Sequence, residues 1–335
     1  MTVAQPTLKP AWYRRLMTLP DPPRVAPRPA QDRDAALARF DELAAADEGI
    51  PEATRSQLFE PEAPARATIV IWHGFTNAPS QFVAVAENLR DRGYRVLLPR
   101  MPYHGEADVL NRDLAKLTPE ELVSQVGTCV DIATGFGDPV WVVGLSAGAT
   151  MAGWAAATRP EVRRLVLAAP LVAPVGAPMP LIRLLVKFPR IVPRFYWWWD
   201  PRVKEKIVGS QHAYPGFPVP GIMPYLRLSE LLFDHTVPIG HELERAVLTS
   251  NPGDFAIRKD AARDFGLRVF APGAAYAGEA VIDGELKWMH DFVEPCSPGS
   301  GTTEQVVAVL LACFGEGEPT AGGVLVPPLV AEQPT

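Results

Sequence analysis

A serine stands at the centre of the pentapeptide GLSAG, residues 144–148. The apolar run 140–143 precedes this pentapeptide, and the run of small helix-forming residues 149–157 follows it. A serine between a strand and a helix, with a glycine two residues before it and another two residues after it, is typical of a nucleophile elbow. The turn is so tight that the serine adopts a strained backbone conformation, and a Cβ at either glycine would collide with neighbouring backbone. The pattern therefore predicts that Ser146 is a nucleophile.

A histidine is the expected partner of such a serine, because a serine hydroxyl is a weak nucleophile near neutral pH and needs a base within hydrogen-bond reach. We select His290 as this base. Its segment, residues 287–295, is expected to form a loop between the last strand and the C-terminal helix, from which a side chain can approach the carboxyl ends of the strands. The alternative is that His290 is an ordinary histidine of a surface loop. The six histidines of the chain are His73, His104, His212, His235, His241 and His290.

Asp254 is the candidate for the third group, a carboxylate that orients the imidazole and stabilises it when it is charged. In an architecture with a nucleophile elbow, the acid falls between the nucleophile and the histidine in chain order. Asp254 does so, in the loop that follows a strand expected at residues 246–249. Asp283 is a weaker rival, while Asp260 and Asp264 are expected to be solvated charges on a helix.

The tetrapeptide HGFT at residues 73–76 follows an apolar strand expected at residues 67–72. A turn at this point can aim the backbone N–H of Phe75 at a reacting oxygen, beside the N–H of Ala147. Two such donors form an oxyanion hole that stabilises the negative charge of the transition state. We assign no proton-transfer role to the imidazole of His73, which is expected to be a turn residue.

The composition is that of an ordinary soluble globular protein, with 335 residues, 47% of them apolar and 21% charged. A net charge of −6 and a sequence pI near 5.6 argue against a nucleic-acid surface. The segment behind Arg14 and Arg15 is Pro-rich rather than apolar, so we expect no secretory signal, and no apolar run is long enough to span a bilayer. A reduced, cytoplasmic setting is expected. The three cysteines, too scattered for a disulfide framework or a metal cluster, are Cys129, Cys296 and Cys313.

Motifs that bind metals or nucleotides are missing from the sequence. The zinc motif H-E-x-x-H does not occur, because the segment 241–245 reads HELER and lacks the second histidine. Neither G-x-G-x-x-G nor a Walker sequence is present. We therefore expect chemistry that needs no cofactor and no metal ion.

Strand and helix patterns alternate along most of the chain, which predicts an α/β fold, a doubly wound and mostly parallel sheet with helices on both faces. The last strand is expected at residues 267–270. Between residues 172 and 240 the alternation stops, and this stretch contains eleven prolines and ten aromatic residues. The expected organisation is a Pro-rich N-terminal arm at 1–30, a core at 31–171 and 241–315, a cap at 172–240 and a disordered tail at 316–335.

The aromatic side chains of residues 172–240 are too many for a short connection to bury by itself. Most of them are expected to pack this cap onto the core. Several are also expected to line an apolar pocket over Ser146 that receives an acyl or aromatic group. The candidate substrate-binding residues are Phe195, Trp197, Trp198 and Trp199.

Four basic residues recur every three or four positions among apolar residues of the cap, namely Arg183, Lys187, Arg190 and Arg194. This spacing fits an amphipathic face that rests on anionic lipid, and it also fits a solvated outer face of the cap. The prolines at positions 189 and 193 interrupt a helix and favour the solvated face. Peripheral membrane contact is therefore the less favoured of these two interpretations.

Four segments together resemble an α/β-hydrolase, in particular the serine carboxylesterase and monoacylglycerol-lipase-like branch, in which HGF precedes the first helix. These segments are HGFT at 73–76, GLSAG at 144–148, NPGD at 251–254 and WMHD at 288–291. The resemblance covers residues 56–315 and implies an ester hydrolase with a cap. The sequence departs from the family at two points. Residues 102–105 read PYHG, where relatives often have Gly-His-Gly, and NPGD lacks the usual glycine two or three residues before its aspartate.

The residues and the resemblance together predict a soluble serine hydrolase that cleaves carboxylic esters with apolar acyl or aromatic groups through an acyl-enzyme. Ser146 would attack the carbonyl, His290 would take its proton, and Asp254 would orient His290. A serine-dependent C–C bond hydrolase or a thioesterase would use the same residues, and a ligand-binding receptor on a hydrolase scaffold is a further alternative. The expected partner is a small ester. The sequence leaves open the acyl chain length, the alcohol and the oligomeric state.

Overall fold

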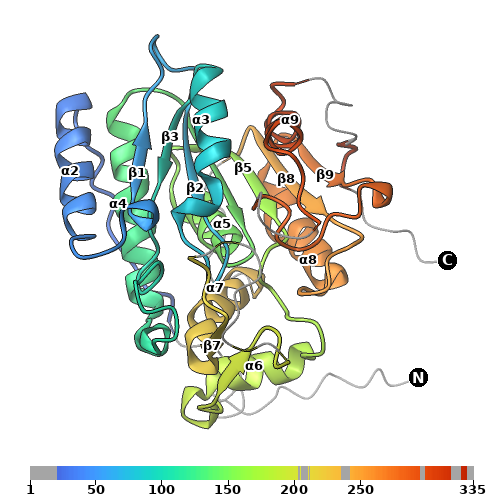
Figure 1. The fold of residues 1–335 in the computed structure, drawn as a ribbon. Helices are drawn as coiled ribbons and strands as arrows, with labels where there is room; N and C mark the ends of the chain where they lie inside the picture. Colours follow the sequence, from blue (N-terminus) through green and yellow to red (C-terminus); the bar gives the residue numbers. More distant parts are fainter. Residues whose placement is uncertain are drawn as a thin grey trace, which may run out of the picture.

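A seven-stranded sheet with helices on both faces forms the centre of the computed structural model (Figure 1). The structure describes residues 21–202, 204, 210, 212–234, 242–294, 299–317 and 326–329. The strands are β1 (Gln57–Phe59), β2 (Thr68–Trp72), β3 (Arg95–Leu98), β4 (Val140–Leu145), β5 (Val162–Ala168), β8 (Arg245–Ser250) and β9 (Ala277–Val281). They lie in the order β1-β3-β2-β4-β5-β8-β9, in which β1 is antiparallel to β3 and every other neighbouring pair is parallel. The predicted mostly parallel α/β sheet is confirmed.

Two hydrophobic cores lie on the two faces of this sheet. The α-helices of the described ranges are α2 (Arg33–Ala45), α3 (Val83–Asp91), α4 (Pro119–Gly135), α5 (Ala147–Thr158), α6 (Met179–Lys187), α7 (Met223–Phe233), α8 (Lys259–Phe265) and α9 (Thr303–Phe314). Side chains of α4, α5 and α7 belong to one core, and side chains of α3 and α9 belong to the other. The central strands β2 and β4 are buried at every position, as their apolar sequences require when both faces of a sheet are covered.

The prediction of a strand at residues 267–270 is wrong. This segment is a π-helical turn, η6 (Gly266–Phe270), which continues α8, and the last strand of the sheet is β9 instead. The buried positions 265, 266, 269 and 270 recur at helical spacing, while the side chains between them are partly or fully exposed. The short apolar run therefore has the period of a helix, and the alanine- and glycine-containing β9 has too few β-branched residues to be recognised from its sequence.

Residues 326–329 of the C-terminal tail pack along the outer edge of β9. The N–H of Leu329 donates to the carbonyl of Ala277 (3.0 Å), and the N–H of Glu279 donates to the carbonyl of Pro327 (2.9 Å). These bonds cover an edge that would otherwise present unpaired backbone groups. No comparable pairing is visible from the composition of the tail, which is rich in glycine and proline.

The described part of the N-terminal arm lies against α4. The N–H of Arg28 donates to both carboxylate oxygens of Asp131 (3.1 Å each), and the N–H of Ala30 donates to the carbonyl of Asp131 (3.0 Å). Asp131 also accepts a hydrogen bond from Arg159 at 2.6 Å. One buried carboxylate therefore joins the arm to α4 and to the end of α5.

The stretch between β5 and β8 leaves the sheet. We refer to residues 172–240 as the cap segment, of which 203, 205–209, 211 and 235–240 lie outside the described residues. It contains α6, the antiparallel pair β6 (Tyr196–Trp198) and β7 (Gly216–Pro218), and α7. Figure 1 shows α6 and β7 beyond one end of the sheet, with α7 between them and the sheet. Among the features expected from the sequence, His235, His241 and Cys296 also lie outside the described residues.

Candidate active site

Ser146 occupies the turn between β4 and α5, at the carboxyl end of a central strand. Its backbone has φ 57° and ψ −113°, a conformation that residues with a side chain rarely adopt. Its N–H donates to the carbonyl of Ala168 at the end of β5 (2.8 Å), and its carbonyl accepts from the N–H of Leu171 (3.1 Å). The neighbouring strand thus holds the strained turn in place. This local structure is the one that the G-x-S-x-G pattern predicts.

Gly144 and Gly148 make this turn sterically feasible. A Cβ at Gly144 would lie 2.0 Å from the carbonyl oxygen of Gly148, and a Cβ at Gly148 would lie 2.1 Å from the carbonyl oxygen of Trp72. Both obstacles are backbone atoms, so neither could move aside as a flexible side chain does. The two glycines therefore allow the start of α5 to lie directly against the end of β2, where the HGFT segment begins.

His290 and Asp254 lie in direct contact, although they come from different loops. The Nδ1 atom of His290 lies 2.8 Å from Oδ2 of Asp254. The other carboxylate oxygen of Asp254 accepts from the backbone N–H groups of Ala256 (2.8 Å) and Ile257 (3.2 Å). Burial of Asp254 raises its pKa, but the hydrogen bonds from His290 and the two N–H groups outweigh burial and lower the pKa below its ordinary value. Asp254 is therefore a carboxylate at neutral pH, with its Oδ2 directed at the histidine.

Asn251 and Gly253 join the loop of the acid to the loop of the histidine. The side-chain amide of Asn251 donates to the carbonyl of Met289 (2.7 Å), and its oxygen accepts from the N–H of Gly253 (3.0 Å). A Cβ at Gly253 would lie 2.1 Å from the carbonyl oxygen of Trp288. The glycine directly before the aspartate thus permits the close approach of the two loops. The sequence analysis did not single out Asn251, because nothing local to NPGD indicates a contact with a loop some forty residues later.

The rival aspartates are engaged elsewhere. Asp283 caps the short helix η8 (Gly284–Leu286) by accepting from the N–H of Glu285 (3.0 Å). Asp260 and Asp264 form ion pairs with nearby arginines. Asp254 is the acidic residue of this group whose carboxylate contacts His290.

The hydroxyl of Ser146 makes no hydrogen bond with His290 within the described ranges. Because Asp254 holds Nδ1, the ring nitrogen that remains for a proton of the serine is Nε2. Catalytic hydrogen bonds are often long without a substrate and shorten when the substrate binds.

The backbone N–H groups of Phe75 and Ala147 donate to no protein group of the described ranges. Ala147 is the first residue of α5, where helix geometry leaves the N–H without an acceptor. Phe75 lies in a turn that is closed by a hydrogen bond from the N–H of Asn77 to the carbonyl of Gly74 (3.1 Å). These are the two donors that the sequence analysis assigned to an oxyanion hole.

Asp291 ties the turn of Phe75 to the loop of His290. Its carboxylate accepts from the side-chain amides of Asn77 (3.2 Å) and Gln81. Gln81 in turn accepts from the N–H of Gly74 (2.8 Å). One side-chain network therefore sets the position of the turn relative to the histidine next to Asp291. Sequence reasoning missed this network, since its members are more than two hundred residues apart in the chain.

His73 is buried, and its hydrogen bonds define a neutral ring. Its Nδ1 donates to the carbonyl of Gly74 (2.9 Å), and its Nε2 accepts from the N–H of Met101 (3.2 Å). Burial lowers the pKa of His73 well below the ordinary value, and nearby His104 lowers it further. The imidazole thus links the loops after β2 and β3, and both of its nitrogens are occupied by backbone.

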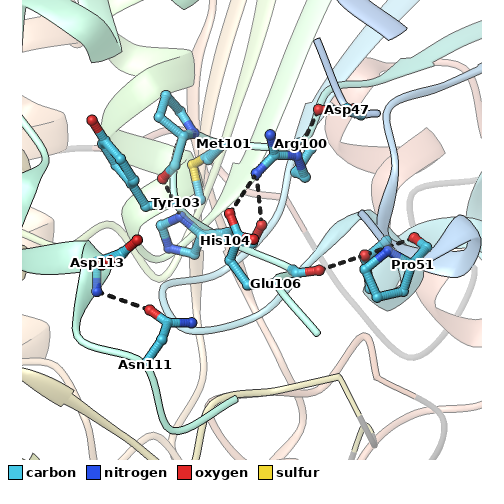
Figure 2. Close-up of polar contacts among 12 residues, drawn as sticks. Asp47, Pro51, Arg100, Met101, Tyr103, His104, Glu106, Asn111 and Asp113 are labelled. Carbon is cyan, nitrogen blue, oxygen red and sulfur yellow. Dashed lines mark hydrogen bonds and ion pairs between the residues drawn. The ribbon is translucent and has the colours of Figure 1, made fainter. Parts of the chain in front are cut away.

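The ring of His104 lies beside that of His73. His104 belongs to the loop that follows β3, which is drawn in Figure 2. Its Nδ1 donates to the carbonyl of Pro102 (2.9 Å), while its Nε2 is buried without a hydrogen-bond partner in the described part of the chain. Burial lowers the pKa of His104 to about 4. Figure 2 shows Arg100 holding this loop: the guanidinium donates to Asp47 (2.6 Å) and to the carbonyl of His104 (2.9 Å).

An aromatic cluster joins this part of the core to the cap segment. The ring of Phe75 lies 4.9 Å from that of Phe217 and 5.6 Å from that of Tyr225, measured between centroids. The ring of Tyr214 stacks on that of His104 at 6.4 Å. These cap residues are almost completely buried. They seat the cap segment on the turn of Phe75 and on the loop of His104.

The four predicted substrate-binding residues occupy more exposed positions. Phe195, Trp197 and Trp199 are each about half exposed, and Trp198 is partly buried against Tyr196. Trp199 is the member that reaches the turn of Phe75, because its indole N–H donates to Oγ1 of Thr76 (2.9 Å). Trp197 contacts Phe195, at 6.2 Å between ring centroids. The contacts of the cap with the HGFT turn thus come from Trp199 and from the buried aromatic cluster.

A family model described as the alpha/beta hydrolase fold matches residues 67–233. This match, the sheet order and the strained serine turn show that the chain has the α/β-hydrolase fold. No curated protein matches the chain. The described residues contain no group of three or more histidine, cysteine, aspartate or glutamate residues arranged to hold a metal ion, and none of their helices is long and apolar enough to cross a bilayer.

Solved structures with the same fold include enzymes that act on lipids and esters. A structure from the metagenome-derived lipolytic enzymes LipS and LipT is 19% identical, covering 78% of this chain and 98% of that chain, with a TM-score of 0.56. The monoacylglycerol lipase of Paleococcus ferrophilus is 16% identical, covering 77% of this chain and 98% of that chain, with a TM-score of 0.55. DcsB in complex with its substrate analogue is 14% identical, covering 78% and 94%, with a TM-score of 0.51. At these identities the similarity concerns the fold.

Proposed function

We propose that this protein is a serine hydrolase that cleaves carboxylic esters through an acyl-enzyme. The observation that carries the proposal is the contact of His290 with Asp254 at the same end of the sheet as the strained turn of Ser146. Structural ion pairs of histidine and aspartate exist in many proteins, but a strained serine held between two obligatory glycines has no evident structural purpose. Its cost is explained if the serine reacts.

In the proposed mechanism, Ser146 attacks the carbonyl carbon of the ester and Nε2 of His290 takes the hydroxyl proton. Asp254 keeps the Nδ1–H tautomer and stabilises the imidazolium, a role that suits its lowered pKa. The N–H groups of Phe75 and Ala147 donate to the oxyanion that forms. His290 then protonates the leaving alcohol, and water activated by the same imidazole hydrolyses the acyl-enzyme.

The substrate we propose has an apolar acyl or aromatic group. The turn of Phe75 is flanked by the rings of Phe217 and Tyr225, and Trp199 approaches the same turn. A small ester bound over Ser146 would meet these apolar surfaces, so most of its binding free energy would come from burial of its hydrocarbon.

The test uses Ser146→Ala, which should leave the fold intact because a small residue fits the turn. A fluorophosphonate probe should label the wild type once and should not label this variant, and hydrolysis of p-nitrophenyl esters should fall by about five to six orders of magnitude. Ser124→Ala, an exposed serine of α4, is the matched control and should behave as the wild type. Unchanged turnover in Ser146→Ala would refute the proposal. Esters and thioesters of one acyl group, assayed side by side, distinguish an esterase from a thioesterase.

A further inference from the structure

The outer side of the cap segment exposes an unusual amount of apolar surface. Of the twelve large apolar side chains that are exposed in the described part of the chain, eight lie between residues 175 and 199. On α6, Ile182 and Val186 are buried, whereas Leu181 and Leu184 are exposed at 44% and 45%. The helix is therefore apolar on its inner side and on part of its outer side. The outer apolar side chains contact water rather than the core, so packing of the described residues does not explain them.

Cationic side chains accompany these apolar groups, and acidic side chains do not. The stretch 175–199 contains four basic residues and no aspartate or glutamate, in a chain with a net charge of −6. Arg183 pairs with Glu230 at 2.8 Å, but Arg190 and Arg194 are exposed and form no ion pair with the described residues. Two uncompensated positive charges thus lie beside the exposed apolar side chains.

We propose that this surface docks on an anionic lipid bilayer. We call it the cap face and define it by Leu181, Leu184, Phe188, Arg190, Ile191, Arg194 and Trp197. Apolar side chains with an aromatic ring and neighbouring cations are the combination that enters the headgroup region of a membrane, with the cations near lipid phosphates. This use of the surface goes beyond ester hydrolysis and does not require it.

Charge favours a bilayer over the other occupants. A second copy of the chain placed on the same face would bring Arg190 and Arg194 of both copies together, with no acidic residue between 175 and 199 to compensate them. Residues 1–20 of the chain carry Lys9, Arg14 and Arg15 and no acidic residue, so their charge does not complement the face. An anionic lipid surface supplies the missing negative charge.

Sedimentation of the full chain with lipid vesicles tests this proposal. The wild type should sediment with vesicles of phosphatidylglycerol and phosphatidylcholine at low salt, and much less with vesicles of phosphatidylcholine alone. The double variant Arg190→Gln/Arg194→Gln should bind the anionic vesicles roughly 30-fold more weakly. The double variant Leu184→Gln/Ile191→Gln should also lose binding, because it removes apolar contacts. Ser146→Ala should bind as the wild type does, which separates docking from hydrolysis.

The matched control is Arg90→Gln/Arg92→Gln, which removes the same formal charge from α3, at the other end of the molecule in Figure 1. This control should bind the vesicles as the wild type does. The proposal is wrong if the wild type fails to bind anionic vesicles, or if the control loses as much binding as the cap-face variant. It is equally wrong if size-exclusion chromatography shows a dimer that Leu184→Gln/Ile191→Gln dissociates, since a second copy would then cover the face.

Trp199 makes a separate contact, on the side of the cap segment that meets the site. Its indole N–H donates to Oγ1 of Thr76 (2.9 Å), and that hydroxyl donates to the carbonyl of Phe75 (2.6 Å). The carbonyl of Thr76 accepts from the N–H of Tyr214 (2.7 Å). Thr76 is buried and has a positive φ of 64°, which is strained for a β-branched residue. Two cap residues therefore hold the strained residue that follows Phe75.

We infer that Trp199 is a positioning residue, which fixes the direction of the Phe75 N–H by holding Thr76. The inference rests on the proposed function, because it concerns the donor to the oxyanion. Loss of the indole N–H should release the hydroxyl of Thr76 and let the turn relax. The donor would then be misdirected in the transition state, while contacts with the bound ester would change little.

A double-mutant cycle tests this inference. Trp199→Phe keeps an aromatic ring but loses the N–H, and Thr76→Val keeps the shape but loses the hydroxyl. Each should lower kcat roughly tenfold with little change in KM, and the double variant should be no worse than either single variant. Thr76→Ser retains the hydroxyl and should keep near-wild-type kcat. Thermal melting of each variant shows whether the fold is retained.

Additive losses in the cycle, or a change confined to KM, would show that Trp199 only packs or binds substrate. If the wild type hydrolyses esters and the cycle is additive, the inference alone is wrong. If the wild type neither hydrolyses esters nor reacts with a fluorophosphonate, the proposed function and this inference are wrong together.

Discussion

The cap segment meets the core at the turn of Phe75 and at the loop of His104, and the sheet and the cap segment hold their residues by different means. At the sheet, Ser146 is held by a backbone hydrogen bond to the end of β5, and the side-chain amide of Asn251 joins the loop of Asp254 to the loop of His290. In the cap segment, aromatic rings and a few side-chain hydrogen bonds hold β6 and β7 in place. If Ser146 reacts as proposed, the reactive groups are therefore placed by rigid strand ends, and the cap segment is the part that can vary with the substrate.

Asp254 is the group at the strand ends whose replacement should have the largest effect after that of Ser146. Asp254→Asn should lower kcat by roughly four orders of magnitude with little change in KM, because the amide cannot enforce the Nδ1–H tautomer or stabilise the imidazolium. Steady-state kinetics with a p-nitrophenyl ester measures both constants.

Asp283→Asn is the matched control, since Asp283 caps η8 and does not contact His290. Its kcat should stay within a few-fold of the wild type. If Asp283→Asn is inactive while Asp254→Asn is active, the assignment of the acid is wrong.

The candidate site residues at the strand ends could be predicted from the sequence because their patterns are local. Gly144 and Gly148 flank Ser146 within one pentapeptide, and His290 and Asp254 each follow a strand in the expected chain order. The start of α4 has a local signal of the same kind, because Thr118 and Glu121 form a capping box within four residues.

The residues that the sequence did not reveal act across long separations. Asp291 accepts from Asn77 and Gln81, and His73 accepts from the N–H of Met101, yet no spacing rule links these positions. The wrong prediction of a strand at 267–270 has a related cause. The four apolar residues alone fit a short strand, and the helical spacing of the buried positions becomes visible only when Phe265 is included.

His104 lies where the core meets the cap segment, and its titration should make the stability of the protein depend on pH. Its pKa is about 4 in the folded protein because the ring is buried, against about 6.5 when the chain is unfolded. Between these two pH values the unfolded state binds more protons than the folded state. The contribution of His104 to the free energy of unfolding is therefore complete above about pH 6.5, and it is lost as the pH falls towards 4. The loss by pH 4 should be about 3 kcal/mol from this residue.

Urea denaturation at a series of pH values from 7 to 4 measures this loss. His104→Asn should be less stable than the wild type at pH 7, because it loses the stacking on Tyr214. Its amide can still donate to the carbonyl of Pro102 but cannot titrate in this range, so its stability should depend less steeply on pH. Parallel curves for the wild type and the variant would show that His104 does not titrate as stated.

The smallest expected effects lie in the cap segment, in the preference for acyl chain length. Each buried methylene contributes about 0.8 kcal/mol, which is roughly a fourfold gain in kcat/KM per methylene until the pocket is full. We therefore expect kcat/KM to rise from acetate to at least butyrate esters and then to level off or fall.

Single changes of Trp197, Trp198 and Trp199 to alanine should separate two roles, because a pocket residue shifts the preferred chain length whereas a packing residue lowers the melting temperature alone. Trp199→Ala should give the clearest shift, since Trp199 contacts the turn of Phe75. If none of the three changes the preference, the acyl group is bound by the core and by the buried ring of Phe217 rather than by the exposed aromatic residues of the cap.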